Sequence, residues 1–365
     1  MDLEALVSEV RAEPARRDEL VPLLHEGHLV YDGRGESVAL RLRGWVMATF
    51  ETVGLPPAAV PAVVETLRTG LDAYSVAAAA RAVRGAAAPD PVLVSALLAA
   101  LIGMRGRDDS VSFAGLRPVW PDPDATTALT EVLRTLRDIG PLAHTAHADL
   151  IDVRRRHGST WSPPVQQALD EAISATARTT LSLNEVAAPA LGYLPVPAGS
   201  MDIGSVELED QSGVVTGFDE HFRGRPHVVA FFYTRCGNPA KCSATIARLA
   251  ALQARLPDGV GIAGISYDPG YDIPERLASY GAARGLRFTD TVRLFRARAG
   301  HDVLRSHFDL MVGYVGTIVN QHAIELYLLG SDTTTVHAWT RVEWTVDEVL
   351  DVLAGLGDLR VAGRE

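Results

Sequence analysis

Two cysteines lie six positions apart in the stretch VVAFFYTRCGNPAKCSATIARL, which covers residues 228–249. Cys236 and Cys242 are the only cysteines of the 365-residue chain, and Lys241 is its only lysine. The thiolate form of cysteine attacks disulfides and binds soft metal ions. The stretch therefore predicts a metal site or a redox-active thiol pair, and two small buried apolar side chains are the alternative.

The elements around the two cysteines favour the thiolate form. The apolar run VVAFFY predicts a buried strand, and CSATIARLAALQARL predicts a helix that begins near Ser243. Both cysteines would then lie in the turn that leads into a helix N-terminus. Free amide N–H groups and the positive end of the helix dipole stabilise a thiolate there. Lys241 would add to this effect if its ammonium group turned inward.

The rest of the C-terminal half alternates between strand and helix patterns. This order predicts an α/β sandwich of the thioredoxin type, placed at residues 203–365. The predicted elements are a hairpin in GSVELEDQSGVVTGFDEHF, a strand in GVGIAGISY, a helix in IPERLASYGAARG, strands in GTIVNQHAIELYLLG and TTVHAWTRV, and a closing helix in TVDEVLDVLAGLG.

The N-terminal half shows apolar stripes at helical spacing from about Glu36 to Thr176, separated by Gly, Pro and Asp. We expect an all-α domain over residues 1–177 that resembles HEAT repeats, with a helical domain without repeats as the alternative. Residues 178–202 contain three prolines and no sustained period, which is typical of a linker.

Composition and charge exclude some classes of protein. The formal net charge of -11 and a pI near 5.5 argue against nucleic-acid binding, which needs concentrated Lys and Arg. The N-terminus is acidic and lacks the apolar core of a secretory signal. The apolar stretch at residues 92–104 is shorter than the roughly 20 residues that span a bilayer. We therefore expect a cytoplasmic protein without a membrane span. In a reducing compartment, paired cysteines serve metal or redox chemistry more often than they form a structural disulfide.

Several histidines are weaker candidates for metal binding. His25 with His28, and His144 with His147, are each spaced three apart, as two ligands on one helix face would be. Neither pair has a third ligand nearby in the sequence, so a structural role is the stronger reading of both. Four further histidines flank the cysteine stretch or the predicted strands, and position alone does not select among them: His227, His301, His307 and His337.

Three motifs in order resemble the Sco/SenC family of copper-binding, thioredoxin-fold proteins that assist cytochrome oxidase assembly. They are FFYTRCGNPAKCSATIARL, then GISYDPGYDIPERLASYGAARG, then VNQHAIELYLL. In the second motif, Asp268, Pro269, Asp272 and Pro274 fit the family's D-P-x-x-D-x-P segment. In the third, His322 fits the family's distant histidine. The resemblance covers about residues 206–353.

The resemblance implies a copper site. Cys236 and Cys242 would supply two thiolates and His322 an imidazole nitrogen, a set suited to Cu(I) that accepts Cu(II) with one further ligand. Asp268 and Asp272 would orient the imidazole or the cysteine loop. The chain departs from the family in having five residues between its cysteines in place of three and in lacking a proline after the second. We also expect it to differ from the exported family members in having no export signal.

The sequence therefore predicts a cytoplasmic Sco-like protein that holds copper through two Cys and one His. The copper would be delivered to a protein client, recognised through the helical domain, or used to oxidise a small-molecule substrate. One alternative is a metal-free thiol-disulfide oxidoreductase or peroxidase, in which Cys236 attacks and Cys242 resolves. Another is a scaffold whose thioredoxin fold has become a non-catalytic binding module. The sequence is compatible both with a copper carrier and with a copper-dependent enzyme.

Overall fold

The chain divides into two compact units, Met1–Gly192 and Tyr193–Glu365. Their boundary lies outside the described residues, and so does the linker predicted over residues 178–202. The predicted domain limits therefore stay a prediction. The structure is a computed structural model that describes residues 2–88, 90–107, 109–117, 122–177, 203–341 and 344–362.

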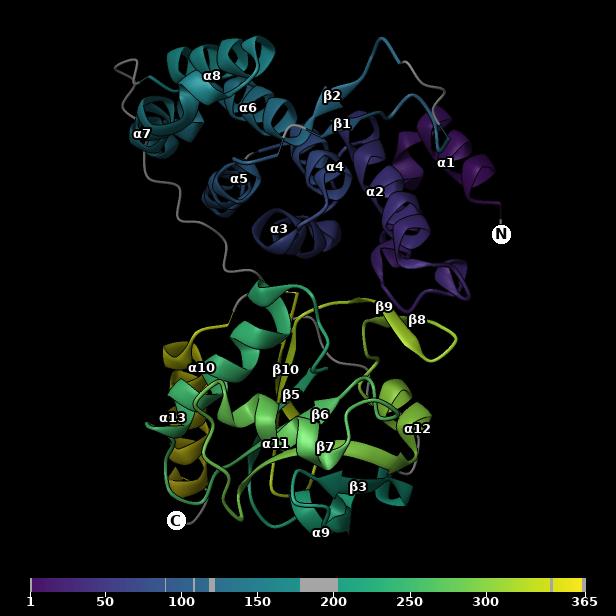
Figure 1. Cartoon of the computed structure of the whole chain (residues 1–365), viewed down its shortest axis with the longest axis vertical. Helices are drawn as coiled ribbons and strands as arrows, with labels where there is room; N and C mark the ends of the chain where they lie inside the picture. Colours follow the sequence, from purple (N-terminus) through teal and green to yellow (C-terminus); the bar gives the residue numbers. More distant parts are fainter. Residues whose placement is uncertain are drawn as a thin grey trace. The chain divides into compact units, whose positions relative to one another are not determined.

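The N-terminal unit is mostly helical, as predicted, with one short antiparallel strand pair (Figure 1). The resemblance to HEAT repeats stays a prediction. Within the described part of the chain, no helix is both long enough and apolar enough for a membrane crossing. The elements of this unit are α1 (Leu3–Ala12), η1 (Pro14–Leu24), η2 (Leu29–Tyr31), α2 (Glu36–Val53), η3 (Pro57–Ala59), α3 (Val60–Thr69), α4 (Ala73–Arg84), α5 (Pro91–Met104), β1 (Ser110–Val111), β2 (Thr126–Thr127), α6 (Ala128–Ile139), η4 (Gly140–Ala146), α7 (His147–His157), η5 (Gly158–Thr160) and α8 (Pro163–Thr176).

Helix α4 forms the centre of the N-terminal unit. It packs against α2, α3, α5 and α6 (Figure 1). Its sequence AYSVAAAARAVR is rich in alanine, and almost all of its side chains are buried. Small side chains let neighbouring helices approach closely, because little volume separates the backbones. The alanine run therefore explains why α4 lies inside the unit.

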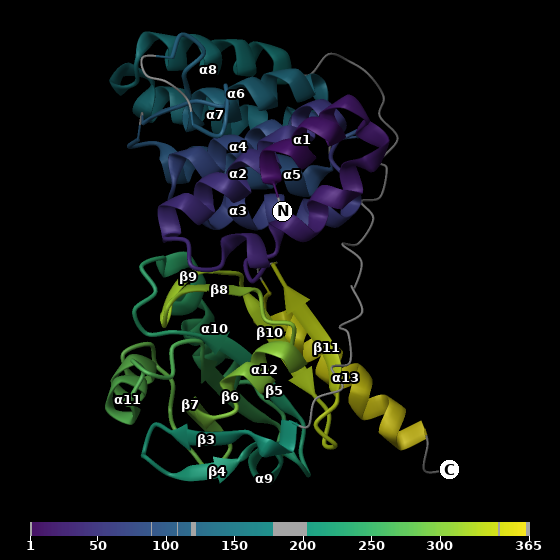
Figure 2. The ribbon, with the colours of Figure 1, turned by 90° about the vertical axis from the view of Figure 1, so that its right-hand side faces the viewer.

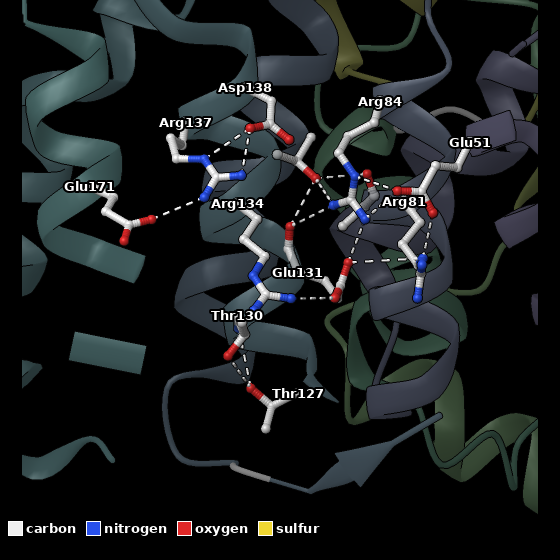
Figure 3. Close-up of polar contacts among 12 residues, drawn as sticks. Glu51, Arg81, Arg84, Thr127, Thr130, Glu131, Arg134, Arg137, Asp138 and Glu171 are labelled. Carbon is white, nitrogen blue, oxygen red and sulfur yellow. Dashed lines mark hydrogen bonds and ion pairs between the residues drawn. The ribbon is translucent and has the colours of Figure 1, made fainter. Parts of the chain in front are cut away.

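A network of charged side chains ties α4 to its neighbours (Figure 3). Arg84 contacts Glu131 of α6 at 2.6 Å and Glu51 of α2 at 2.7 Å. It also donates a hydrogen bond of 2.9 Å to Thr135, while Arg81 contacts Glu51 at 2.6 Å. Glu131 is only 2% exposed, so burying its carboxylate without these partners would be costly in free energy.

The C-terminal unit is built on a mixed seven-stranded sheet in the order β11-β10-β5-β6-β7-β3-β4. Strands β5, β6 and β7 are parallel, and the other pairs in this sheet are antiparallel. Its elements are η6 (Ile203–Ser205), β3 (Glu207–Asp210), β4 (Val215–Gly217), α9 (Phe218–Phe222), β5 (His227–Phe232), η7 (Pro239–Ser243), α10 (Ala244–Gln253), β6 (Gly261–Ser266), α11 (Pro274–Ala282), β7 (Val292–Ala299), α12 (His301–His307), β8 (Val312–Val315), β9 (Ile318–His322), β10 (Glu325–Leu329), β11 (Thr335–Thr340) and α13 (Val346–Ala362).

Helices cover both faces of this sheet. The side chains of β5 alternate between two apolar cores, since successive residues of a strand point to opposite faces. Helices α10, α11 and α13 close one core, and α9 and α12 close the other. In Figure 1, α10 and α13 lie on the left of the unit and α12 on its right. Figure 2 shows the strands of the sheet from the side, with β10 and β11 near one edge and β3 and β4 near the other. The arrangement confirms the predicted thioredoxin-like fold.

One predicted strand is in fact two strands. The segment GTIVNQHAIELYLLG forms β9 and β10, which are separated by Ala323 and Ile324. Strand β9 pairs with β8 in a separate hairpin, whereas β10 pairs with β5 and β11 in the large sheet. At the break, Ala323 N–H donates to the Met311 carbonyl, outside both ladders. His322 therefore ends a hairpin strand and does not lie inside the sheet.

Candidate metal centre

The two cysteines occupy the connection between β5 and α10. Cys236 follows the end of β5 and is partly buried, whereas Cys242 lies in the π-helical turn η7 and is 2% exposed. The turn begins at Asn238, whose side chain accepts the N–H of Ala240 at 3.0 Å. Pro239 follows at the first position, where its missing N–H costs nothing. These residues place Cys242 directly before the first turn of α10.

His322 brings its imidazole to both sulfur atoms. Its Nε2 lies 3.3 Å from Sγ of Cys236 and 3.7 Å from Sγ of Cys242. Its Nδ1 lies 2.8 Å from the carbonyl oxygen of Ala323. Because a carbonyl only accepts hydrogen bonds, Nδ1 carries the proton and the lone pair of Nε2 faces the sulfurs. This is the tautomer that a metal-binding histidine needs.

The three side chains have the spacing of a metal site. Their ligand atoms all lie within 4.8 Å of one another, and no other group of three or more such donors occurs in the described residues. Donors bound to one metal at about 2.0–2.3 Å lie roughly 3.5–4 Å apart. Two sulfurs and one imidazole nitrogen form a soft set, which fits copper. The predicted residues Cys236, Cys242 and His322 thus lie together.

The two thiols differ in acidity. The hydrogen bond from the Cys242 thiol is the largest effect that lowers the pKa of Cys236 to about 3, and the doubly protonated form of His322 adds to it, although burial acts in the opposite direction. Complete burial raises the pKa of Cys242, and the neighbouring Cys236 thiolate raises it further. Without a metal, the pair is therefore a thiolate beside a protonated thiol. Cys236 is the nucleophile of the two.

We expect Cys236 in the reduced, metal-free chain to react with iodoacetamide at a nearly constant rate between about pH 5 and 8. The reaction of an ordinary thiol, with a pKa of about 8.5, becomes about tenfold slower for each unit by which the pH is lowered in this range, because its thiolate fraction falls. Mass spectrometry of the Cys236 peptide measures the rate. His322→Ala removes one of the interactions that stabilise the thiolate and should restore part of the pH dependence. A tenfold loss per unit in the unmodified chain would contradict the prediction.

Lys241 connects the cysteine turn to the histidine strand. Its Nζ donates a hydrogen bond of 2.6 Å to the backbone carbonyl of His322. Its positive charge also acts to lower the pKa of Cys242, but burial outweighs this effect. The predicted stabilisation of a Cys242 thiolate is therefore minor. The lysine chiefly fixes the backbone that carries the imidazole.

The two predicted aspartates contact the residues just before Cys236. Asp272 is fully buried and accepts hydrogen bonds from the hydroxyls of Thr234 and Ser266, and from the Thr234 N–H at 3.1 Å. Asp268 contacts Arg235 at 2.7 Å. Of the two roles predicted for them, orienting the loop or orienting the imidazole, these contacts serve the loop.

A buried tyrosine and glutamate beside the site were not predicted. The ring of Tyr267 lies 5.6 Å from that of His322, and its hydroxyl donates to the carboxylate of Glu325. The same carboxylate accepts the N–H of Met311 and the hydroxyl of Tyr327, each at 3.1 Å. Glu325 thus anchors the chain on either side of β8 and β9. No motif marks it, because it begins an otherwise apolar strand.

The histidine pairs proposed as alternatives make local contacts. Nδ1 of His25 accepts the N–H of Gly27 at 3.0 Å, and Nδ1 of His28 accepts a backbone N–H two residues on at 3.2 Å. His144 contacts a backbone carbonyl at 3.2 Å, and His147 contacts a threonine hydroxyl at 3.1 Å. No pair belongs to a group of three donors in the described residues. The same holds for the flanking histidines, which are His227, His301, His307 and His337.

Comparison with known proteins agrees with the motifs. The SCO1/SenC family model matches residues 202–356. A SCO1/SenC family lipoprotein from Bacillus anthracis is 19% identical over 46% of this chain and 99% of its own, with a TM-score of 0.38. ScoI from Arabidopsis thaliana with copper bound is 18% identical over 42% and 96%, with a TM-score of 0.34. The Xanthomonas campestris bacterioferritin comigratory protein is 22% identical over 44% and 96%, with a TM-score of 0.32. No curated protein matches the chain. The C-terminal unit, over residues 202–356, thus matches the SCO1/SenC family that its cysteine, aspartate and histidine motifs resemble.

Proposed function

We propose that the chain binds Cu(I) through Cys236, Cys242 and His322 and carries it to a protein client. The observation that supports this proposal is the meeting of two sulfurs and one lone-pair nitrogen within 4.8 Å. The three residues come from the β5 connection, the turn η7 and the end of β9. Three soft donors brought together by three different elements favour a common ligand.

The acidity and burial of the cysteines suit a carrier of Cu(I). Cys236 is already a thiolate without metal, so binding requires a proton to leave only Cys242. Three donors satisfy Cu(I), whereas Cu(II) would take a further ligand. Cys236 is the more exposed of the two cysteines, so a thiolate of the client would reach the ion from that side. Exchange of one thiolate for another leaves the oxidation state of copper unchanged.

The surroundings of the site favour a fixed geometry. Lys241 holds the backbone of His322, and Asp272 and Asp268 hold the residues before Cys236. Such supporting contacts keep ligands in place and raise metal affinity. The recognition of the client through the helical unit, and a cytoplasmic location, belong to the same proposal and rest on the sequence alone.

An anaerobic Cu(I) titration of the reduced chain against a chromogenic chelator tests the proposal. The chain is expected to bind the first equivalent of Cu(I) more tightly than the chelator does. His322→Ala should weaken this equivalent by at least about tenfold, because it removes a ligand. His337→Ala, which changes a histidine outside the site, is the matched control and should have no effect. Binding no tighter than the chelator, or indifference to His322→Ala, would overturn the copper proposal.

A thiol-disulfide oxidoreductase is the second candidate. The low pKa of Cys236 and the adjacent protonated thiol of Cys242 favour it, since this pairing suits an attacking and a resolving cysteine. Its chemistry does not need the imidazole as a metal ligand. A chain that binds Cu(I) no more tightly than the chelator does, but that catalyses thiol-disulfide exchange through Cys236, would select this candidate over the copper carrier.

A further inference from the structure

An arginine that follows helix α11 contacts the turn that carries the cysteines. Nε of Arg284 donates a hydrogen bond of 3.0 Å to the hydroxyl of Ser243, which directly follows Cys242. The guanidinium carbon of the same arginine lies 3.4 Å from the ring centroid of Tyr280. This tyrosine stacks in turn on Phe232, the last residue of β5, at 5.6 Å between ring centroids. The guanidinium group of Arg284 is therefore held beside the second cysteine.

Two further arginines contact one tyrosine ring near the first cysteine. Arg235 directly precedes Cys236, and its guanidinium carbon lies 4.4 Å from the ring centroid of Tyr271. The guanidinium carbon of Arg276 lies 3.9 Å from the same centroid, and its Nη1 donates a hydrogen bond of 2.6 Å to the Tyr271 carbonyl. Stacking on an aromatic ring holds the planar guanidinium group in a fixed orientation. The two arginines thus form an oriented pair that begins at the residue before Cys236.

Two of the three arginines have no carboxylate partner among the described residues. Asp268 contacts Arg235 at 2.7 Å. In contrast, Arg276 and Arg284 donate only to uncharged oxygens, which are backbone carbonyls and one hydroxyl. Glu275, the acidic neighbour of Arg276 in the chain, is exposed and forms no ion pair with it in the described part of the chain. Uncompensated positive charge at this place contrasts with a net charge of -11 for the whole chain.

The three arginines lie on the accessible side of the metal centre. Arg235 and Arg276 are exposed, and so are Gly237 and Pro239, which lie between the cysteines in the sequence. Cys236 is the more exposed of the two cysteines. A partner that reaches Cys236 across these exposed residues therefore also meets guanidinium groups.

We propose that Arg235, Arg276 and Arg284, which we call the arginine surface, bind acidic residues that flank the cysteine of the protein client. This inference rests on the proposed function, to which it adds the chemistry of the partner. An oriented guanidinium group that lacks a carboxylate partner binds a carboxylate with two parallel hydrogen bonds. Complementary charge also speeds the encounter of two molecules and disfavours partners of the wrong charge. The surface thus selects a client cysteine with acidic neighbours over one with basic neighbours.

Synthetic cysteine peptides test the arginine surface without copper. Three peptides of equal length carry glutamates, glutamines or lysines on both sides of one cysteine, whose sulfur is joined in a disulfide to thionitrobenzoate. The Cys236 thiolate attacks the peptide sulfur, a Cys236–peptide disulfide forms, and thionitrobenzoate leaves as a thiolate whose absorbance gives the rate. With the reduced full chain in excess at low salt, we expect the glutamate peptide to react at least about fivefold faster than the lysine peptide. Screening at about 0.5 M salt should remove this difference.

Charge-removing variants locate the effect. Arg276→Gln combined with Arg284→Gln should bring the ratio of the glutamate rate to the lysine rate close to one, because both uncompensated charges are lost. Arg255→Gln is the matched control, because Arg255 is exposed but lies beyond the far end of α10, where it pairs with Asp347 at 2.7 Å. It should leave the ratio unchanged. Each rate is divided by the rate with iodoacetamide, an uncharged reagent, so that any change in the Cys236 thiolate itself cancels.

Equal rates for the glutamate and lysine peptides at low salt would overturn the inference, as would an unchanged ratio in the double variant. If the double variant does not fold, Arg276→Gln alone decides the question and should lower the ratio at least about twofold. The Cu(I) titration and the peptide rates are independent measurements. A chain without peptide preference can still bind Cu(I) tightly, and a chain that fails the titration can still show the preference, so the two proposals fail separately.

Discussion

Replacement of Cys242 by serine is expected to lower the affinity of the chain for the first equivalent of Cu(I) by at least about 1000-fold. Changes in the residues around metal ligands typically cost 10- to 100-fold, and loss of a ligand costs more. A serine hydroxyl is a hard donor that stays protonated at neutral pH, so it does not replace a thiolate. Its similar size should preserve the packing of the buried side chain at position 242.

The same chelator competition measures this loss. Ser243→Ala is the matched control, because residue 243 belongs to the same π-helical turn but its hydroxyl accepts a hydrogen bond from Arg284 at 3.0 Å, away from the sulfurs. Cys236→Ser should cause a loss of similar size, since its Sγ lies 3.3 Å from Nε2 of His322. A Cys242→Ser variant that binds as tightly as Ser243→Ala would show that the buried sulfur is not a ligand.

The sequence predicts the cysteine half of the site well. Two cysteines at the junction of an apolar strand and a helix pattern must lie near a helix N-terminus, and this holds for Cys242 in η7. The prediction succeeds because both elements have strong local signals, an apolar run and a 3.6-residue period. The π-helical turn itself was not predicted, because it depends on how the five residues between the cysteines pack.

The histidine half depends on contacts that are distant in sequence. The apolar pattern around His322 reads as one continuous strand, yet the chain breaks at Ala323 and Ile324. Periodicity does not show such a break, because both β9 and β10 are buried and satisfy the same pattern. The break lets His322 leave the sheet and reach Cys236, more than eighty residues earlier in the chain. The family resemblance, and not the residue pattern, selected this histidine.

Buried polar groups are the part of the structure that the sequence reveals least. Glu325 begins a strand whose other residues are apolar, and its partners, Tyr267, Tyr327 and Met311, are up to 58 residues away. His227 likewise begins a buried strand, and its neighbour Gly261 comes from the next strand. A sequence pattern shows that such positions are buried, but the identity of the partner depends on strand order and register.

Replacement of Arg84 by methionine is expected to destabilise the N-terminal unit by about 3–5 kcal/mol. The substitution removes the arginine that contacts Glu131 at 2.6 Å and leaves a carboxylate that is 2% exposed. Removing one partner of a buried ion pair is this costly because the other charge loses compensation while staying out of water. Arg134 contacts the same carboxylate only at 3.5 Å and is half exposed, so it replaces little of the lost interaction.

Arg137→Met is the matched control for Arg84→Met (Figure 3). Arg137 lies on the same helix as Glu131 and pairs with Asp138 and Glu171, but all three side chains are about 40% exposed. Such a surface pair contributes about 0–1 kcal/mol.

Amide hydrogen exchange of peptides from α4 and α6 measures the free energy of opening, and peptides of the C-terminal unit serve as an internal control. Glu131→Met combined with Arg84→Met should recover much of the loss, because no charge is then left buried. Equal effects of Arg84→Met and Arg137→Met would show that burial of Glu131 does not set the strength of this network.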